Sequence, residues 1–115
     1  MKDMNGKIQY KDKEYRIVFN LNVMEAIQDE YGSLDKWGSL TDGTNGEPNA
    51  KAVIFGFTQM LNEGIDIDNE ENGTDIKPFT LKQVGRIITD VGLAEATQTL
   101  NQTVIDSTQS EEKNA

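Results

Sequence analysis

The chain has 115 residues, which is the size of one domain with one modest hydrophobic core. It contains no cysteine and no histidine, which excludes disulfides, thiol catalysis, Cys/His zinc sites and imidazole bases. Its formal net charge of −9 argues against a general binder of nucleic acid or anionic membranes, because phosphate groups would be repelled.

The charge is unevenly distributed along the chain. Residues 1–20 carry five bases and three acids, a local charge of +2, so the remainder carries −11. A basic N-terminal piece on an acidic body would allow head-to-tail pairing of copies, although solvated surface charge is the simpler interpretation. The start has no apolar core of signal-peptide length, and no stretch approaches a membrane span. We therefore expect a soluble intracellular protein.

The first structural pattern is the alternation of apolar and polar residues in KIQYKDKEYRIVF, residues 7–19. It continues on both sides of a polar turn near Asp12 and Lys13, so we predict a β-hairpin. An isolated hairpin is only marginally stable in water, so its aromatic face must pack on helices or pair with another chain.

A helix is predicted to follow directly. Asn22 and Glu25 have capping-box spacing, and Leu21 stands at the staple position before them. One buried stripe is expected from the apolar residues at helical spacing, which are Leu21, Met24, Ile27 and Tyr31. Gly32 is expected to end this helix.

A short second unit brings several apolar residues to the end of that helix. Ser33 can cap another turn, which Gly38 is expected to close. This places Tyr31, Leu34 and Trp37 at one apolar corner. For Trp37, the chain's single tryptophan, we favour a cover over the core, with a grip on a neighbouring chain as the alternative.

The next helix is predicted over residues 48–63, after a turn-rich loop at residues 41–49. Its apolar stripe lies within about 120° of arc and consists of Val53, Ile54, Phe57, Met60 and Leu61. Phe55 falls on the opposite, polar side, which suggests an exposed anchor for a partner. Gly64 is expected to end the helix.

An acidic loop is expected over residues 66–78. Its alternating acids resemble the start of a calcium-binding EF-hand loop. However, Glu71 stands where that loop needs glycine, and Lys77 stands where it needs a bidentate glutamate. We therefore expect no metal site.

The clearest helix start is Thr80, which forms a capping box with Gln83, while Phe79 and Val84 occupy the staple positions. The expected stripe of this helix consists of Leu81, Val84, Ile87, Ile88 and Val91. After a break at Gly92, a last helix over residues 93–106 is expected to bury Leu93, Ala96, Leu100 and Val104. Residues 107–115 are expected to be a disordered polar tail. The sequence thus predicts one α+β domain, residues 1–106, with an N-terminal β-hairpin and about four α-helices.

The search for chemistry finds no catalytic or cofactor-binding pattern. The carboxylate pairs lie in polar contexts, and no glycine-rich loop joins a strand to a helix to hold phosphate. We therefore expect a protein without enzymatic activity, catalytic residues or cofactors. Aromatic residues are numerous for so small a core, and such residues are enriched at interfaces. The partner-binding candidates are Phe55, Trp37, Tyr31 and Leu34.

The order of these features resembles the small tail assembly chaperones of long-tailed (siphovirus-type) phages and prophages of Gram-positive bacteria. The resemblance covers residues 7–108 and rests on three segments: NLNVMEAIQDEYGSLDKW, AVIFGFTQMLNEG and KPFTLKQVGRII. It implies a non-enzymatic chaperone that binds the long helical tape measure protein, keeps it soluble and is displaced by the tail tube protein. It also implies self-association and absence from the mature virion. The family supplies no motif-defined binding residues.

Two other interpretations stay open. A structural tail component, such as a tube or connector subunit, would be present in virions, although tube proteins are mainly β. An acidic inhibitor of a host DNA-binding protein would need carboxylates at phosphate spacing along one face, and the densest acidic run here is the expected loop.

Overall fold

A computed structural model gives the fold and describes residues 4–44 and 46–113, with side chains described for residues 6–44 and 46–108. Within these residues an antiparallel hairpin is followed by five helices, which confirms the α+β prediction and adds one helix to the expected number. The elements are β1 (Met4–Tyr10), β2 (Lys13–Phe19), α1 (Leu21–Tyr31), α2 (Leu34–Thr41), α3 (Ala50–Asn72), α4 (Leu81–Val91) and α5 (Leu93–Lys113).

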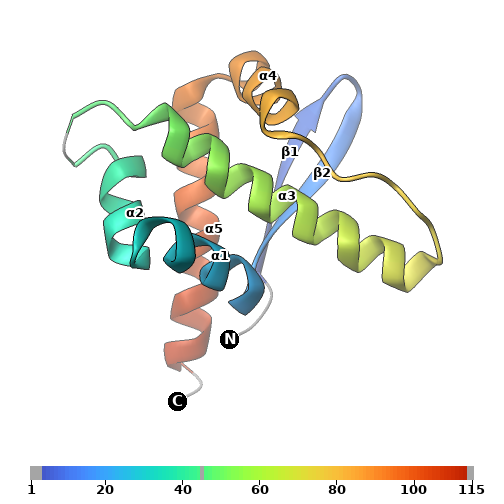
Figure 1. Ribbon diagram of the computed structural model, residues 1–115, viewed down its shortest axis with the longest axis horizontal. Helices are drawn as coiled ribbons and strands as arrows, with labels where there is room; N and C mark the ends of the chain where they lie inside the picture. The colour runs from blue at the N-terminus through green and yellow to red at the C-terminus, as the bar shows by residue number, and fades with distance from the viewer. Residues whose placement is uncertain (1–3, 45, 114–115) are drawn as a thin grey trace.

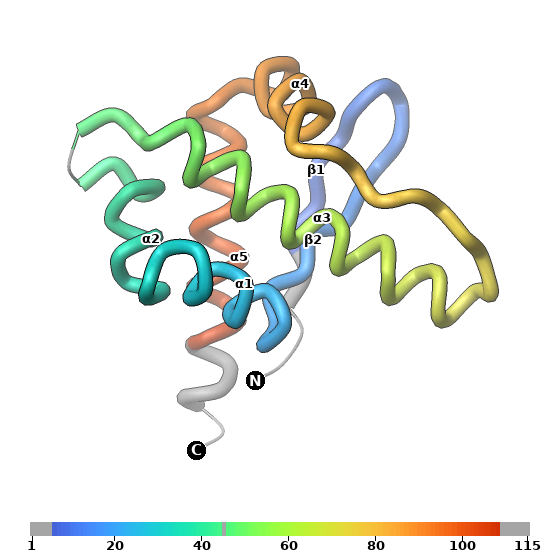
Figure 2. The backbone as a smooth tube through the Cα atoms, viewed as in Figure 1, coloured from blue at the N-terminus to red at the C-terminus, as the bar shows by residue number. Residues whose placement is uncertain are grey.

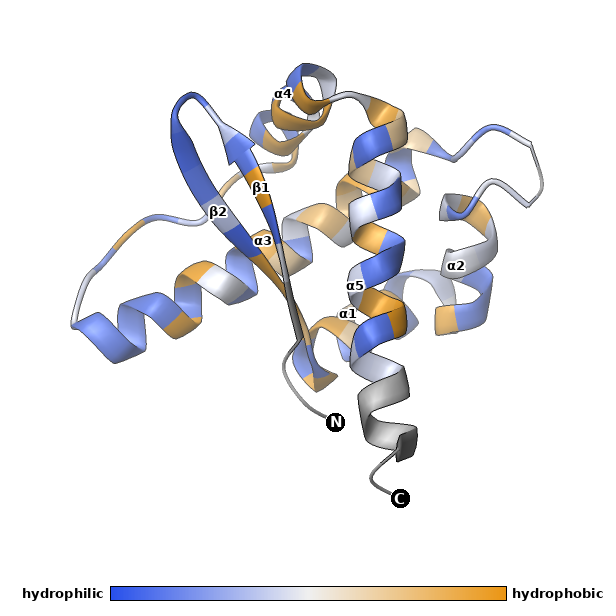
Figure 3. Cartoon of the chain, turned by 180° about the vertical axis from the view of Figure 1, so that it is seen from behind, coloured by the Kyte–Doolittle hydropathy of each residue, from blue (hydrophilic) through white to orange (hydrophobic). Residues whose placement is uncertain are grey.

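The long helix α3 is the axis of the molecule (Figure 1). It crosses in front of the hairpin, and α4 lies above α3 at the top of the view (Figures 1 and 2). Seen from behind, α5 and the hairpin lie side by side (Figure 3). The core lies between these layers, and its largest fully buried side chains are Trp37, Phe19, Phe57, Ile17, Ile27 and Met60.

The hairpin forms as predicted, with its turn one residue earlier than expected. Lys11 and Asp12 adopt positive φ angles of 49° and 64°, as a tight two-residue hairpin turn requires. Ile17 and Phe19 point into the core, as the alternation predicts. Val18 is fully buried as well, so the end of β2 is covered on both faces.

The start of α1 differs from the prediction. Asn20, and not Asn22, caps the helix, because its side chain accepts the Val23 N–H at 3.3 Å. The Asn20 amide also donates to the carboxylate of Glu63 on α3 at 2.6 Å. This tertiary contact fixes the helix entrance, so the predicted capping box from Asn22 to Glu25 is wrong.

The buried face of α1 is correspondingly rotated. Val23 and Ile27 are buried, whereas Leu21, the predicted staple, is 65% exposed. Met24 and Tyr31 pack against the core while staying partly exposed.

The start of α2 agrees with the prediction, and its end does not. Gly32 ends α1 with a φ of 92°, and Ser33 caps α2, both as predicted. The helix then continues through Gly38 to Thr41, so the predicted end at Gly38 is wrong. Trp37 and Thr41 lie one turn apart and are both buried, so packing holds the last turn in place.

The largest difference concerns α3, which runs to Asn72 instead of ending at Gly64. Gly64 is buried inside the helix, and a Cβ there would lie 2.9 Å from the carbonyl oxygen of Arg16. The glycine therefore allows β2 to approach α3 closely and does not stop the helix. The Arg16 guanidinium also lies 2.9 Å from the Asp68 carboxylate, which stabilises the extension.

The predicted acidic loop is thus half helix and half a returning segment. The Asn69 side chain accepts the Ile76 N–H and donates to the Ile76 carbonyl, both at 3.0 Å. Two turns earlier in α3, the Asn62 side chain accepts the Phe79 N–H at 2.8 Å and donates to the Phe79 carbonyl at 3.0 Å. Two asparagines therefore hold the returning segment along α3.

The last two helices agree with the prediction at their junction but not at the chain's end. The Thr80 capping box is present, and Gly92 separates the helices with a φ of 104°. The backbone of α5 continues to Lys113, beyond the expected helix end at residue 106 and into the segment expected to be a disordered tail, and residues 114–115 lie outside the described residues. Ser107 is buried and donates its hydroxyl to the Phe19 carbonyl at 3.0 Å, which ties the extension to β2. Leu93, expected to be buried, is 42% exposed.

No helix among the described residues combines the length and the apolar character needed to cross a membrane.

Candidate functional site

An open groove with a volume of about 1060 Å³ runs between α3 and α4, and we call it the α3–α4 groove. Its apolar lining comes from both helices: Ile54 and Phe55 on α3, and Leu81 on α4. Tyr10, beside the hairpin turn, also contributes to the lining. The apolar lining of the groove therefore comes from three elements, β1, α3 and α4.

The amphipathic pattern of α4 explains why the groove lies there. Val84, Ile87 and Ile88 are buried in the core. Leu81, Gly85 and Thr89 follow one another at intervals of four residues, so they form a single ridge along the groove. Leu81, expected to be in the core stripe, is instead 55% exposed.

Gly85 contributes to the depth of the groove. A Cβ at this position would meet only the Ile54 Cδ1 atom, at the ordinary contact distance of 3.7 Å. Glycine in a helix costs about 1 kcal/mol relative to alanine. Neither the backbone nor a close neighbour requires it here, and its effect is to leave open space between the helices.

A second hollow of about 370 Å³ continues the groove, with Ile54, Gly85 and Thr89 shared between them. It ends at Leu93, the partly exposed first residue of α5. The apolar surface therefore extends along the whole of α4, from Leu81 to Leu93.

The rim of the α3–α4 groove is basic. Four cations line it, Lys11, Lys51, Lys82 and Arg86, against two acids, Glu30 and Asp90. The complete chain has 11 basic and 20 acidic residues, so this groove reverses the balance of the protein. An acidic ligand group would meet a local excess of positive charge here.

Two of the predicted partner-binding residues lie together beside this groove. The rings of Phe55 and Tyr31 meet edge to face, with centroids 5.6 Å apart and planes at 73°. Phe55 lines the groove, and Tyr31 packs behind it, partly buried. Burial raises the pKa of the Tyr31 phenol, and the nearby Glu30 carboxylate raises it further. The Tyr31 hydroxyl is buried and has no hydrogen-bond partner among the described residues.

The other two predicted residues lie elsewhere. Trp37 is 1% exposed and donates its indole N–H to the Ala52 carbonyl at 2.9 Å, so its ring belongs to the core. Leu34 is half-buried at a different hollow, about 580 Å³, between α2 and α5. The apolar corner expected from the sequence is therefore divided between the core and two surfaces.

Sequence reasoning missed most of the groove. Ile54 and Leu81 are apolar residues at helical spacing, so the sequence predicts both in core stripes, and the cations are scattered along the sequence. The position of Phe55 on the polar side of its predicted helix is the sequence signal for this surface.

The described residues contain no group of three or more acidic side chains arranged to hold a metal ion. Asp66 and Asp68 lie on a continuous helix and not in a calcium-binding loop. The α3–α4 groove offers apolar contacts flanked by cations, a combination suited to an amphipathic partner.

Comparison with known proteins adds no assignment, because no family model, curated protein or solved structure matches the chain.

Proposed function

We propose that this protein is a non-enzymatic tail assembly chaperone of a long-tailed phage or prophage. It binds the tape measure protein in the host cytoplasm, keeps it soluble during tail assembly and releases it to the tail tube protein. The proposal combines the resemblance of three sequence segments with the character of the α3–α4 groove.

The observation that carries the proposal is the open apolar groove itself. A client that is a long, helical protein exposes apolar helix faces before the tail tube encloses it. Grooves between helices bind such faces through side chains at intervals of three and four residues. Ile54, Phe55 and Leu81 provide the matching apolar surface here.

Co-expression with the tape measure protein of the same phage tests the proposal. We expect a soluble complex that is recovered by affinity purification of either partner. An insoluble tape measure protein and no complex would contradict the proposal. Recovery of this protein as a regular component of purified virions would instead favour a structural tail component.

Two matched substitutions show whether the groove is the binding surface. Leu81 and Ile76 are almost equally exposed, at 55% and 56%, but only Leu81 lines the groove. Leu81→Asp should weaken the complex, whereas Ile76→Asp should leave it intact. Aspartate is favourable in the first turn of a helix, so Leu81→Asp should not unfold α4.

A further inference from the structure

We propose that the α3–α4 groove selects amphipathic helices whose apolar stripe is flanked by carboxylate side chains. This inference rests on the proposed use of the groove for binding helices, and it adds the charge of the partner. The argument depends on the cations of the rim and on the apolar surface between them.

The cations are positioned to flank a bound helix. Lys82 and Arg86 are one turn apart on α4 and form a ridge beside that of Leu81 and Gly85. Lys51 lies on α3 one turn before Phe55. Positive charge therefore comes from both helices that form the groove.

These cations are available for a partner. Lys51, Lys82 and Arg86 are exposed, and they form no ion pair with any residue that the structure describes. Elsewhere on the protein, Arg16 pairs with Asp68, and Lys7 lies 3.5 Å from Glu14. Within the described residues, the two rim acids, Glu30 and Asp90, thus leave the four rim cations in excess.

The apolar lining favours a helix over a nucleic acid as the occupant. Ile54, Phe55 and Leu81 would gain by burying apolar side chains, whereas a phosphate backbone would desolvate them without such contacts. The net charge of −9 also repels a polyanion at long range. A short helix with a few carboxylates carries fewer negative charges, so it is repelled less.

Two designed helical peptides test the inference directly. They share one leucine stripe and differ only in flanking residues, glutamate in one and lysine in the other. At physiological salt the glutamate peptide should bind about tenfold more tightly by calorimetry, because its carboxylates pair with the rim cations, whereas the lysine peptide meets like charges. Its affinity should fall as salt is raised.

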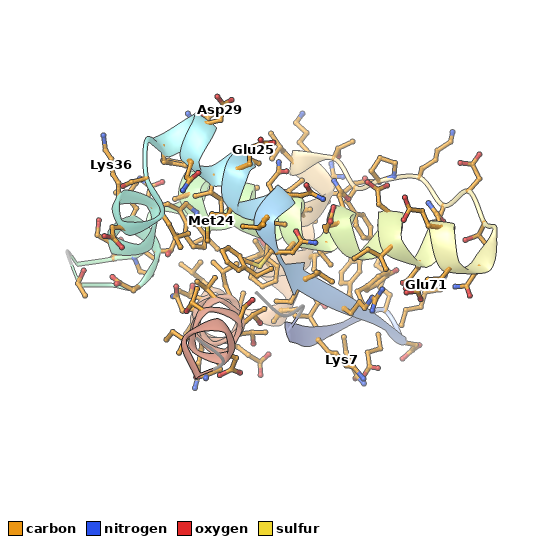
Figure 4. All side chains as sticks on the ribbon, turned by 90° about the horizontal axis from the view of Figure 1, so that it is seen from below. Lys7, Met24, Glu25, Asp29, Lys36 and Glu71 are labelled. Atoms are coloured by element: carbon orange, nitrogen blue, oxygen red, sulfur yellow. The ribbon has the colours of Figure 1, made fainter. Side chains whose placement is uncertain are left out.

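Charge reversal on the protein provides the matched control. Lys82→Glu with Arg86→Glu should reverse the preference, so that the lysine peptide binds more tightly. Lys36→Glu with Lys77→Glu changes the net charge equally but lies outside the groove lining, and Figure 4 shows Lys36 pointing away from the molecule. This second pair should alter either affinity less than about twofold, because neither residue lines the groove and exposed charges outside it are screened by salt.

Several results would overturn the inference. These are equal binding of the two peptides, no binding of either, or an equal effect of the two double reversals. Tighter binding of a single-stranded DNA oligonucleotide than of the glutamate peptide would assign the groove to nucleic acid. A dimer seen by sedimentation that disappears on Lys82→Glu with Arg86→Glu would assign it to a second copy.

The outcome is separable from that of the chaperone proposal. If the peptides discriminate but the tape measure protein does not bind, the groove's charge preference stands and the proposed function falls. If the tape measure protein binds equally to the wild type and to Lys82→Glu with Arg86→Glu, the proposed function stands and the charge preference falls.

Discussion

Two aromatic residues lie at neighbouring positions of α3, one packed against the helix from α2 and the other part of the helix, and their surroundings differ completely. Trp37 fits against Gly56, is 1% exposed, and is held by a hydrogen bond to the Ala52 carbonyl. Phe55, the residue before Gly56, rests on Tyr31 and leaves part of its ring in the α3–α4 groove. One face of α3 is therefore closed by a glycine that admits a large ring, and the adjoining face stays open.

The comparison shows that an aromatic residue becomes part of the core or part of a surface according to what stands opposite it. Gly56 has no side chain, so the indole ring reaches the helix backbone and completes the core. Phe55 instead borders the α3–α4 groove, which Gly85 also lines and which no described side chain fills. The predictions below change one side of this comparison at a time.

Removing the indole ring should have the largest effect. Trp37→Ala should lower the free energy of unfolding by about 3–5 kcal/mol, because it empties a buried site. Urea denaturation followed by circular dichroism measures this loss. Phe55→Ala should cost clearly less, and equal losses for the two would show that Phe55 is also a core residue.

Adding one methyl group to α3 should give the next largest effect. Gly56→Ala should lower the free energy of unfolding by about 1–3 kcal/mol, because the new Cβ would overlap the Trp37 ring. The matched change Gly85→Ala should instead raise it by up to about 1 kcal/mol, because the Cβ has room and alanine favours the helix. Destabilisation by both changes would contradict the contrast between a filled face and an open one.

Introducing a charge into the groove should affect binding more than stability. Phe55→Asp should leave a folded protein, at a cost of about 1 kcal/mol, since the ring is only partly buried. Its affinity for the glutamate peptide should fall at least about tenfold, because an apolar contact is lost and a like charge is added. Phe55→Leu should keep most of the binding. Loss of the fold in Phe55→Asp would place this residue in the core.

The smallest effect is expected behind Phe55. Tyr31→Phe keeps the ring contact and removes a buried hydroxyl without a described partner, so the free energy of unfolding should rise by about 1 kcal/mol or less. Urea denaturation of both proteins at neutral pH measures this change.

The same variant has a defined pH dependence. The folded-state pKa of Tyr31 lies above the ordinary value of 10.0, because burial and Glu30 disfavour the phenolate. Ionisation of Tyr31 therefore costs no stability below pH 10.0, and stability is lost as the pH rises from 10.0 through the folded-state pKa, because the folded protein resists forming the phenolate. Above pH 10.0, urea denaturation should show a larger loss of stability for the wild type than for Tyr31→Phe. Equal losses in the two proteins would contradict a raised pKa for Tyr31.

Local signals in the sequence determined the hairpin, the helix starts at Ser33 and Thr80, and the breaks at Gly32 and Gly92. Each depends on a few neighbouring residues, such as a side-chain oxygen that accepts a backbone N–H or a glycine that adopts positive φ. These contacts form within one turn of chain, so they can be identified without knowing the fold.

Only the tertiary structure decided the rest. Gly64 is a residue type that often ends a helix, but here it allows β2 to cross close to α3. Ser107 lies in a segment of mostly polar residues, but its hydroxyl donates to the Phe19 carbonyl. The site follows the same rule. Phe55 and Tyr31 could be predicted as partner-binding candidates, whereas Leu81 and the basic rim could not. A groove is defined by what packing leaves uncovered, and that depends on residues distant in the sequence.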